Sequence, residues 1–143
     1  MEIRKVKFEE MQEVYELAKK YLREEYTFDL LLNLWSFSPN GFLVAVEKGK
    51  IIGFIIGVKT DASTLRILML AVDKNYRRRG IATSLFKRLQ FNFPEVRKIT
   101  LETRIDNEEA IKFYKKLGFK VVERVKDFYT DGSEAYIMEK VLF

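Results

Sequence analysis

The sequence LAVDKNYRRRGIAT, residues 70–83, is the stretch that decides the fold. It leaves an apolar strand, crosses a basic loop and enters an amphipathic helix that begins near Gly80. The first turn of a helix offers unpaired N–H donors and the positive end of the helix dipole, so phosphate oxygens bind there readily. Three consecutive arginines raise the local potential, while Gly80 and Ala82 let a ligand approach the backbone. The stretch predicts an anion site of pyrophosphate type, with a solvated basic loop as the alternative.

A second informative stretch is LETRIDNEEAIKFYKKLGF, residues 101–119. Glu102 lies near the carboxyl end of a strand that the crossover pattern makes central, where open α/β sheets bind ligands. The alternative for Glu102 is a position facing solvent or paired with Arg104. Asn107 is suited either to cap the following helix or to donate a hydrogen bond to a ligand. Tyr114 lies on the apolar stripe of that helix, which suits a core position as well as a catalytic one.

Hydrophobic periodicity predicts one α/β domain over residues 1–143, with the element order βααββββαβαββ. We expect a central mixed, mostly antiparallel sheet of about seven strands, flanked by about four helices. The expected strands cover residues 1–7, 41–47, 51–59, 65–72, 97–103, 119–125 and 135–142, and the expected helices cover 8–23, 29–37, 80–91 and 107–117.

The composition limits the chemistry that the chain can perform. Its 143 residues include neither Cys nor His, which excludes disulfides, cysteine nucleophiles, a Ser-His-Asp triad and the usual metal ligands. We therefore expect no metal, and acid–base chemistry must come from carboxylates, Tyr, Lys or water.

The charge distribution points to an anionic ligand in the second half of the chain. The net charge of +5 divides into −1 over residues 1–63 and +6 over residues 64–143. We expect no nucleic-acid partner, because the basic residues lack interleaved aromatic platforms and no recognition motif is evident. We also expect a cytoplasmic protein with no membrane partner, because no run of about 18 apolar residues occurs and residues 1–10 lack the apolar core of a signal peptide.

Together, these stretches resemble the GNAT superfamily of acyl-CoA-dependent N-acetyltransferases. The family's pyrophosphate motif, Arg/Gln-x-x-Gly-x-Gly/Ala, is matched by Arg77, Gly80 and Ala82 at the strand-to-helix junction. Its second motif, an Asn followed by a Tyr and a Leu-Gly-Phe ending, is matched by Asn107, by Tyr114 and by residues 117–119. The resemblance covers about the whole chain and implies a GNAT-like α+β fold that uses acetyl-CoA.

Within that superfamily the chain most resembles the RimI-type protein N-terminal acetyltransferases. Glu102 and Tyr114, twelve residues apart, fit that group's base and acid. The segment DFYTDGSEAYIM, residues 127–138, resembles the group's terminal hairpin, but Asp127, Phe128 and Glu134 replace the commoner residues. These departures bear on which peptide N-terminus is acetylated more than on the CoA chemistry.

The resemblance implies a role for each motif residue. Glu102 is the expected base and Tyr114 the expected acid, which also contacts the cofactor. Backbone amides of Leu70, Ala71 and Val72 are expected to polarise the thioester carbonyl, and Asn107 to hold the pantetheine arm. The remaining cofactor residues, expected around the pyrophosphate, are Arg77, Arg78, Arg79, Gly80, Ile81, Ala82 and Thr83.

The acceptor pocket is expected between residues 27–40 and 126–134. Its predicted substrate-binding residues are Tyr26, Phe28 and Tyr129, while Leu31, Trp35 and Phe128 are further candidate walls, with the core as the alternative for Leu31 and Trp35. The expected partner is a protein or peptide N-terminus, with a small amine such as a polyamine or amino acid as the alternative. A non-catalytic CoA-binding sensor is a further alternative, and we expect a monomer or a weak homodimer.

Overall fold

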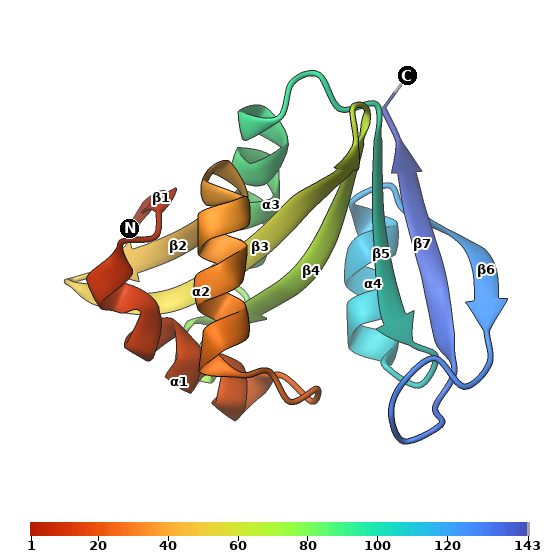
Figure 1. Cartoon of the computed structure of the whole chain (residues 1–143), viewed down its shortest axis with the longest axis horizontal. Helices are drawn as coiled ribbons and strands as arrows, with labels where there is room; N and C mark the ends of the chain where they lie inside the picture. The colour runs from red at the N-terminus through yellow and green to blue at the C-terminus, as the bar shows by residue number, and fades with distance from the viewer. Residues whose placement is uncertain (143) are drawn as a thin grey trace. The chain divides into compact units, whose positions relative to one another are not determined.

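The computed structural model describes residues 1–142, and its elements follow the expected order with one difference. Only three strands lie between the second and third helices, so the order is βααβββαβαββ rather than βααββββαβαββ. The expected ranges 41–47, 51–59 and 65–72 already name three strands, and the structure has these three, so the order counted one strand too many. The strands are β1 (Glu2–Lys5), β2 (Phe42–Glu47), β3 (Lys50–Asp61), β4 (Thr64–Val72), β5 (Lys98–Arg104), β6 (Lys120–Val125) and β7 (Ala135–Val141). The helices are α1 (Met11–Tyr21), α2 (Phe28–Phe37), α3 (Ile81–Asn92) and α4 (Glu108–Lys116) (Figure 1).

The strands form one mixed sheet in the order β1-β2-β3-β4-β5-β7-β6. The pairs β1–β2, β2–β3, β5–β7 and β6–β7 are antiparallel, whereas β4 pairs with β5 in parallel. This confirms the predicted mixed, mostly antiparallel sheet. The chain divides into two compact units: the first unit holds residues 1–58 and 67–94, and the second unit holds residues 59–66 and the described residues from 95 onward.

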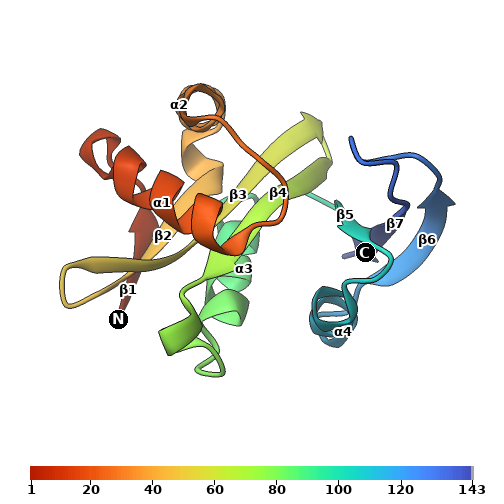
Figure 2. The ribbon, with the colours of Figure 1, turned by 90° about the horizontal axis from the view of Figure 1, so that it is seen from below.

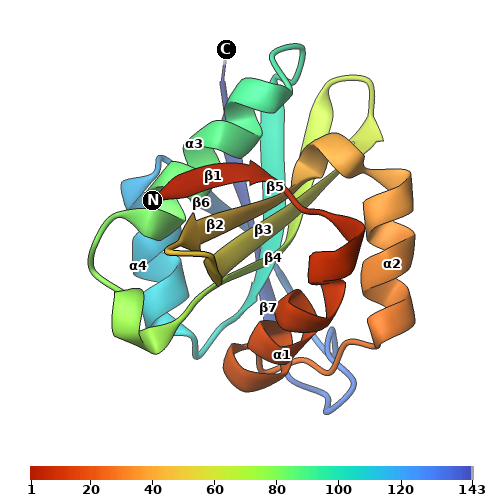
Figure 3. The same cartoon turned by 90° about the vertical axis from the view of Figure 1, so that its left-hand side faces the viewer.

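In the first unit, α1 and α2 lie side by side on one face of the strands and α3 lies on the other (Figures 2 and 3). The sequence of α1 explains this placement, because Met11, Val14 and Ala18 recur at helical spacing and are all buried. They join a core that includes Phe42 and Phe54 from the strands. The α2 helix begins at Thr27, whose hydroxyl accepts a hydrogen bond from the Leu30 amide at 3.0 Å.

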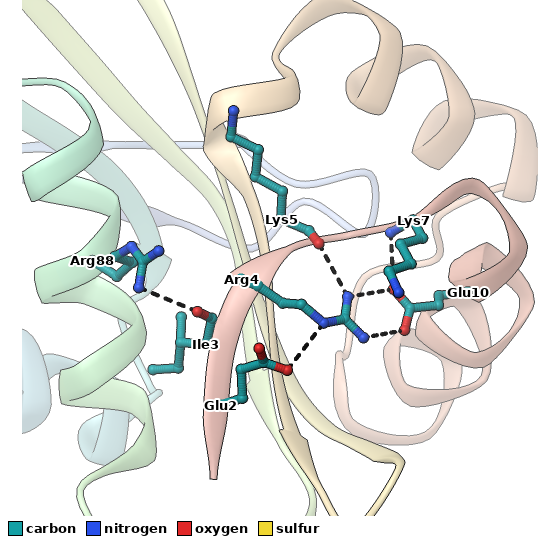
Figure 4. A network of polar contacts seen from close by, with 7 residues as sticks. All are labelled: Glu2, Ile3, Arg4, Lys5, Lys7, Glu10 and Arg88. Carbon is teal, nitrogen blue, oxygen red and sulfur yellow. Dashed lines mark hydrogen bonds and ion pairs between the residues drawn. The ribbon is translucent and has the colours of Figure 1, made fainter.

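A network of polar contacts fixes β1 (Figure 4). The Arg4 guanidinium donates from Nη1 and Nη2 to the two carboxylate oxygens of Glu10, at 2.8 and 2.7 Å, and the Lys7 amide donates to the same carboxylate at 2.8 Å. The bonds from Arg4 hold the pKa of Glu10 below its usual value. Arg88 of α3 donates to the Ile3 carbonyl at 3.2 Å. The strand is therefore tied both to the segment that leads into α1 and to α3.

In the second unit, β5 is central and β7 lies between β5 and β6 (Figure 1). Residues Thr64–Arg66 of β4 pair with Lys98–Thr100 of β5. The α4 helix lies on one side of β5, β7 and β6 (Figure 2). The predicted central position of the strand that carries Glu102 is therefore confirmed.

Among residues 1–142, no helix is both long and apolar enough to cross a membrane.

Candidate active site

The basic loop of the first unit leads from β4 into α3 with the geometry that an anion site requires. Arg78 and Gly80 have positive φ angles of 64° and 76°, which turn the chain sharply before α3 begins at Ile81. The amides of Ile81, Ala82 and Thr83 form the first turn, whose N–H groups have no acceptor within a helix. A Cβ built on Gly80 would meet no atom within 4 Å, so the space beside this backbone is open.

Asp73 fixes the start of this loop. Its side chain is buried, and Oδ1 accepts hydrogen bonds from the Asn75 amide at 2.9 Å and the Tyr21 hydroxyl at 3.2 Å. The Lys50 ammonium lies 3.6 Å from Oδ2. The bond from Asn75, followed by those from Tyr21 and the charge of Lys50, lowers the pKa of Asp73. The carboxylate therefore stays ionised at neutral pH and anchors the turn.

The three arginines of the loop are exposed, and two of them are held by neighbours. Arg77 donates from Nε to the Val72 carbonyl at 3.1 Å, and its guanidinium lies 5.3 Å from the centre of the Tyr21 ring. The Arg79 guanidinium lies 5.2 Å from the centre of the Tyr76 ring. The loop is thus solvated, as the alternative expected, but it also has a defined geometry.

The segment expected to polarise the thioester, residues 70–72, lies at the end of β4. Ala71 and Val72 are buried and Leu70 is half-buried. All three lie beyond Thr64–Arg66, the part of β4 whose pairing with β5 is described.

Glu102 lies in the second unit, on β5, with 17% of its side chain exposed. Arg66 donates to its Oε1 from Nε at 3.0 Å and from Nη2 at 2.6 Å. The alternative of a pair with Arg104 is wrong, because Arg104 bonds Asp131 instead. Arg66 is aligned with Thr100 on β5, two residues before Glu102, so its long side chain reaches Glu102 diagonally across the strands.

This pairing leaves one oxygen of Glu102 available. Within the described chain, Oε2 makes no hydrogen bond, while Oε1 is held by the guanidinium. An oriented carboxylate with one free oxygen is suited to accept a proton from an amine or a water.

Tyr114 is buried on α4, with the rings of Phe113 and Phe119 at 5.1 and 5.4 Å. Its hydroxyl makes no hydrogen bond within residues 1–142, and no fully buried side-chain oxygen in those residues lacks a partner. The ring packs in the core, and the hydroxyl has no protein partner within the described residues. Burial raises the pKa of Tyr114 above its usual range, so the hydroxyl keeps its proton at neutral pH. A core position and a catalytic role are therefore compatible for Tyr114.

Asn107 caps α4, which is one of the two roles expected for it. Its Oδ1 accepts a hydrogen bond from the Ala110 amide at 3.1 Å. Its side-chain NH₂ group is not used by that bond, so capping and donation to a ligand do not compete.

The acceptor candidates are divided between the units. In the first unit, Tyr26 and Phe28 are half-buried against its core, and Phe28 lies edge-on to Tyr15 at 5.6 Å. Leu31 is fully buried, which confirms the core alternative for it. Trp35 also packs against the core, with the Phe8 ring at 5.7 Å.

In the second unit, Phe128 and Tyr129 lie on the loop between β6 and β7, with ring centres 4.9 Å apart. Phe128 is exposed, and Tyr129 is half-buried beneath the Arg104 guanidinium. That Tyr26 and Tyr129 together hold a peptide stays a prediction.

Sequence reasoning missed Arg66, Asp73 and Arg104 as supports of these residues. A signal for Arg66 was present, because it is the one charged residue in β4 and Glu102 is an acidic residue on the strand that follows the crossover. Within residues 1–142, no cluster of three acidic residues is placed to hold a metal ion.

Comparison with known proteins assigns the chain to a protein family. The Acetyltransferase (GNAT) family matches residues 8–119. The chain therefore belongs to the GNAT acetyltransferase family.

Three relatives are similar along nearly the whole chain. An uncharacterised N-acetyltransferase of Methanocaldococcus jannaschii is 35% identical over 98% of this chain and 91% of its own length. An N-alpha-acetyltransferase of Sulfurisphaera tokodaii is 29% identical over 95% of this chain and 90% of its own. The crystal structure of Ard1 from Thermoplasma volcanium superposes with a TM-score of 0.94, at 35% identity over 99% of this chain and 97% of that one. The expected GNAT-like fold and the acetyltransferase class are confirmed.

Proposed function

We propose that this protein is an N-alpha-acetyltransferase, which moves an acetyl group from acetyl-CoA to the N-terminal α-amine of a protein or peptide. The observation that carries the proposal is Glu102, a half-buried carboxylate with one oxygen held by Arg66 and the other free. It supplies a base in a chain without His or Cys. The name of the Sulfurisphaera tokodaii relative supports the α-amine as the acceptor.

The proposed acceptor suits a carboxylate base. The attacking amine must be neutral, and a peptide α-amino group with a pKa of about 7.7 to 8.0 is partly neutral at pH 7, whereas a Lys amine near 10.4 is not. The nitrogen attacks the thioester carbonyl carbon and gives its proton to Oε2 of Glu102, directly or through a water. The carbon–sulfur bond then breaks, and the electron pair leaves on the thiolate.

Tyr114 assists the departing thiolate by donating a hydrogen bond. Its raised pKa keeps the proton on the hydroxyl throughout. Because a thiolate with a pKa near 8.5 is less basic than the Tyr114 phenolate, a hydrogen bond is favoured over full proton transfer. The assistance is therefore modest.

The basic loop and the end of β4 fit the rest of the cosubstrate. The pyrophosphate suits the open backbone beside Gly80 and the first-turn amides of α3, with the arginines adding positive charge. The amides of residues 70–72 polarise the thioester carbonyl, and the free NH₂ group of Asn107 suits the pantetheine arm. Tyr26 and Phe28 of the first unit and Tyr129 of the second unit remain the proposed acceptor-binding residues.

We further propose a single-domain protein that acts in the cytoplasm as a monomer or weak homodimer. Sedimentation of the purified protein with and without acetyl-CoA tests the oligomeric state. A small amine as acceptor is not favoured by the names of the relatives.

The test is release of CoA thiol from acetyl-CoA with free N-terminal peptides, N-blocked lysine peptides and polyamines as acceptors. The protein has no cysteine, so a thiol reagent sees no background from it. We expect turnover on free N-terminal peptides, and we expect Glu102→Gln to lower it about 10²- to 10⁴-fold. Turnover on polyamines alone would overturn the acceptor, and binding of acetyl-CoA without turnover would indicate a sensor.

A further inference from the structure

We propose that Arg104 is a positioning residue for the acceptor: from the end of β5 it clamps the loop between β6 and β7 (residues 126–134) and so fixes the ring of Tyr129. The inference rests on the proposed function, because it assigns the origin of acceptor binding at the same site.

The first observation is a buried charge that the proposed chemistry does not use. Arg104 is only 7% exposed. Burying a guanidinium is costly unless partners compensate it. Its Nη1 donates to Oδ2 of Asp131 at 2.9 Å, and its Cζ lies 4.3 Å from the centre of the Tyr129 ring. One side chain thus holds an acidic and an aromatic residue of the same loop.

The second observation is that the loop is closed on itself around these two residues. The Ser133 carbonyl accepts from the amides of Phe128 and Tyr129, both at 3.1 Å, and the Gly132 amide donates to the Tyr129 carbonyl at 2.9 Å. Oδ1 of Asp131 accepts from the Ser133 amide at 3.0 Å. The loop is therefore cross-linked within itself, and the bond that Arg104 donates to Asp131 ties it to β5.

The third observation is the position of Arg104 on the strand. Glu102 and Arg104 are two residues apart on β5, so both side chains project to the same face of the strand. Along this strand, one residue supplies the proposed base and the next on that face supplies the loop clamp. Placement of the acceptor amine relative to its base thus depends on the clamp.

The chain offers a matched control on the same hairpin. Arg124 of β6 pairs with Glu134 at 2.5 Å, but its side chain is 55% exposed and none of its described contacts involves Tyr129. Arg124→Gln removes an Arg–carboxylate pair from the hairpin without touching the clamp.

The experiment measures separate KM values for a free N-terminal peptide and for acetyl-CoA in Arg104→Gln, Arg104→Lys, Asp131→Asn and Arg124→Gln. We expect Arg104→Gln to raise the peptide KM about 10- to 100-fold, because a loop that is no longer held must be ordered when the peptide binds. The KM for acetyl-CoA should stay within about twofold. Arg104→Lys should recover part of the loss, because it restores the charge but not the planar fork. Arg124→Gln should match the native enzyme.

Asp131→Asn keeps the inference testable if Arg104→Gln fails to fold, because Asp131 is half exposed and its loss leaves no cavity. An unchanged peptide KM in Asp131→Asn, or equal shifts of both KM values, would overturn the clamp. Hydrogen exchange at the Phe128 and Tyr129 amides distinguishes failure of the clamp from failure of the proposed function. Faster exchange in Asp131→Asn supports the clamp even where no peptide is acetylated, and unchanged exchange contradicts it.

Discussion

The basic loop before α3 and the end of β5 carry the two parts of the proposed chemistry, and they are built in opposite ways. In the loop, the functional groups are mainly backbone amides, exposed by the left-handed turn at Gly80 and by the start of a helix. At the end of β5, the functional groups are side chains that other side chains hold in place. Arg66 holds Glu102, and Arg104 holds the loop that carries Tyr129.

This difference determines which amino-acid substitutions each region tolerates. A backbone cradle depends on chain conformation and open space, so its arginines can vary while Gly80 cannot carry a side chain without cost. A site of paired side chains depends on charge and length, so a single substitution leaves a partner uncompensated. The predictions below separate the two modes.

The largest effect is expected at the base. Glu102→Gln removes the proton acceptor, so kcat/KM should fall about 10²- to 10⁴-fold. Binding of acetyl-CoA, measured by calorimetry, should be retained. Full activity of this variant across pH 6 to 9 would remove Glu102 from the role of base.

The next effect is expected at the backbone cradle. Gly80→Ala places a methyl group in the open space where we expect phosphate, and loss of one charge-assisted contact corresponds to an increase of about 10- to 100-fold in the KM for acetyl-CoA.

Gly49→Ala is the matched control for this variant, because Gly49 has a φ of 78° and an equally open surrounding, but it lies in the turn between β2 and β3. Both variants should lose similar stability to left-handed strain, and only Gly80→Ala should change KM. Equal KM values for the two variants would count against the cradle.

These two regions also differ in how far the sequence predicts them. The sequence names the candidate cradle residues one by one, because Gly80, Ala82 and the arginines follow one another along the chain, and their role stays a prediction. The sequence does not name the partners of Glu102 and Tyr129, because Arg66 and Arg104 act across strands or from strand to loop, and such neighbours depend on register.

The fold was predicted for a similar reason. Most helices and strands show their own hydrophobic period, and Asn107 marks a helix start that the structure confirms. The order βααββββαβαββ counted one strand too many before α3, because only three strands are expected between residues 41 and 72, and the structure has these three.

A smaller effect is expected for Tyr114→Phe. The ring contacts with Phe113 and Phe119 remain, so the melting temperature should be unchanged. Loss of one hydrogen bond to the leaving thiolate should lower kcat about two- to tenfold. Since burial raises the pKa of Tyr114, native activity should show no loss from tyrosine ionisation up to about pH 10. An unchanged kcat would remove Tyr114 from the acid role.

The smallest effect is expected where neither region is involved. Glu10→Gln breaks the ion pair with Arg4, in which both side chains are less than a quarter exposed. The unfolding free energy should fall by about 1 kcal/mol at pH 7. The KM values for peptide and for acetyl-CoA should be unchanged.

The pH dependence of that loss has a defined sign. The folded-state pKa of Glu10 is lowered, so the pair's stabilisation is present above the unfolded pKa near 4.3 and is lost as pH falls through the folded value. The unfolding free energies of both proteins, measured with urea, should therefore converge once the pH lies below the folded-state pKa of Glu10. A difference that persists there would mean that the pair does not act through the charge of Glu10.

The most direct test of the proposed activity locates the acetyl group. A peptide with both a free N-terminus and an internal lysine is incubated with the protein and acetyl-CoA, and the product is fragmented in a mass spectrometer. We predict a single acetyl group on the N-terminal nitrogen, formed at least about 100-fold more slowly with Glu102→Gln. Acetylation of the lysine side chain, or none with acetyl-CoA bound, would contradict N-terminal acetylation as the function of this protein.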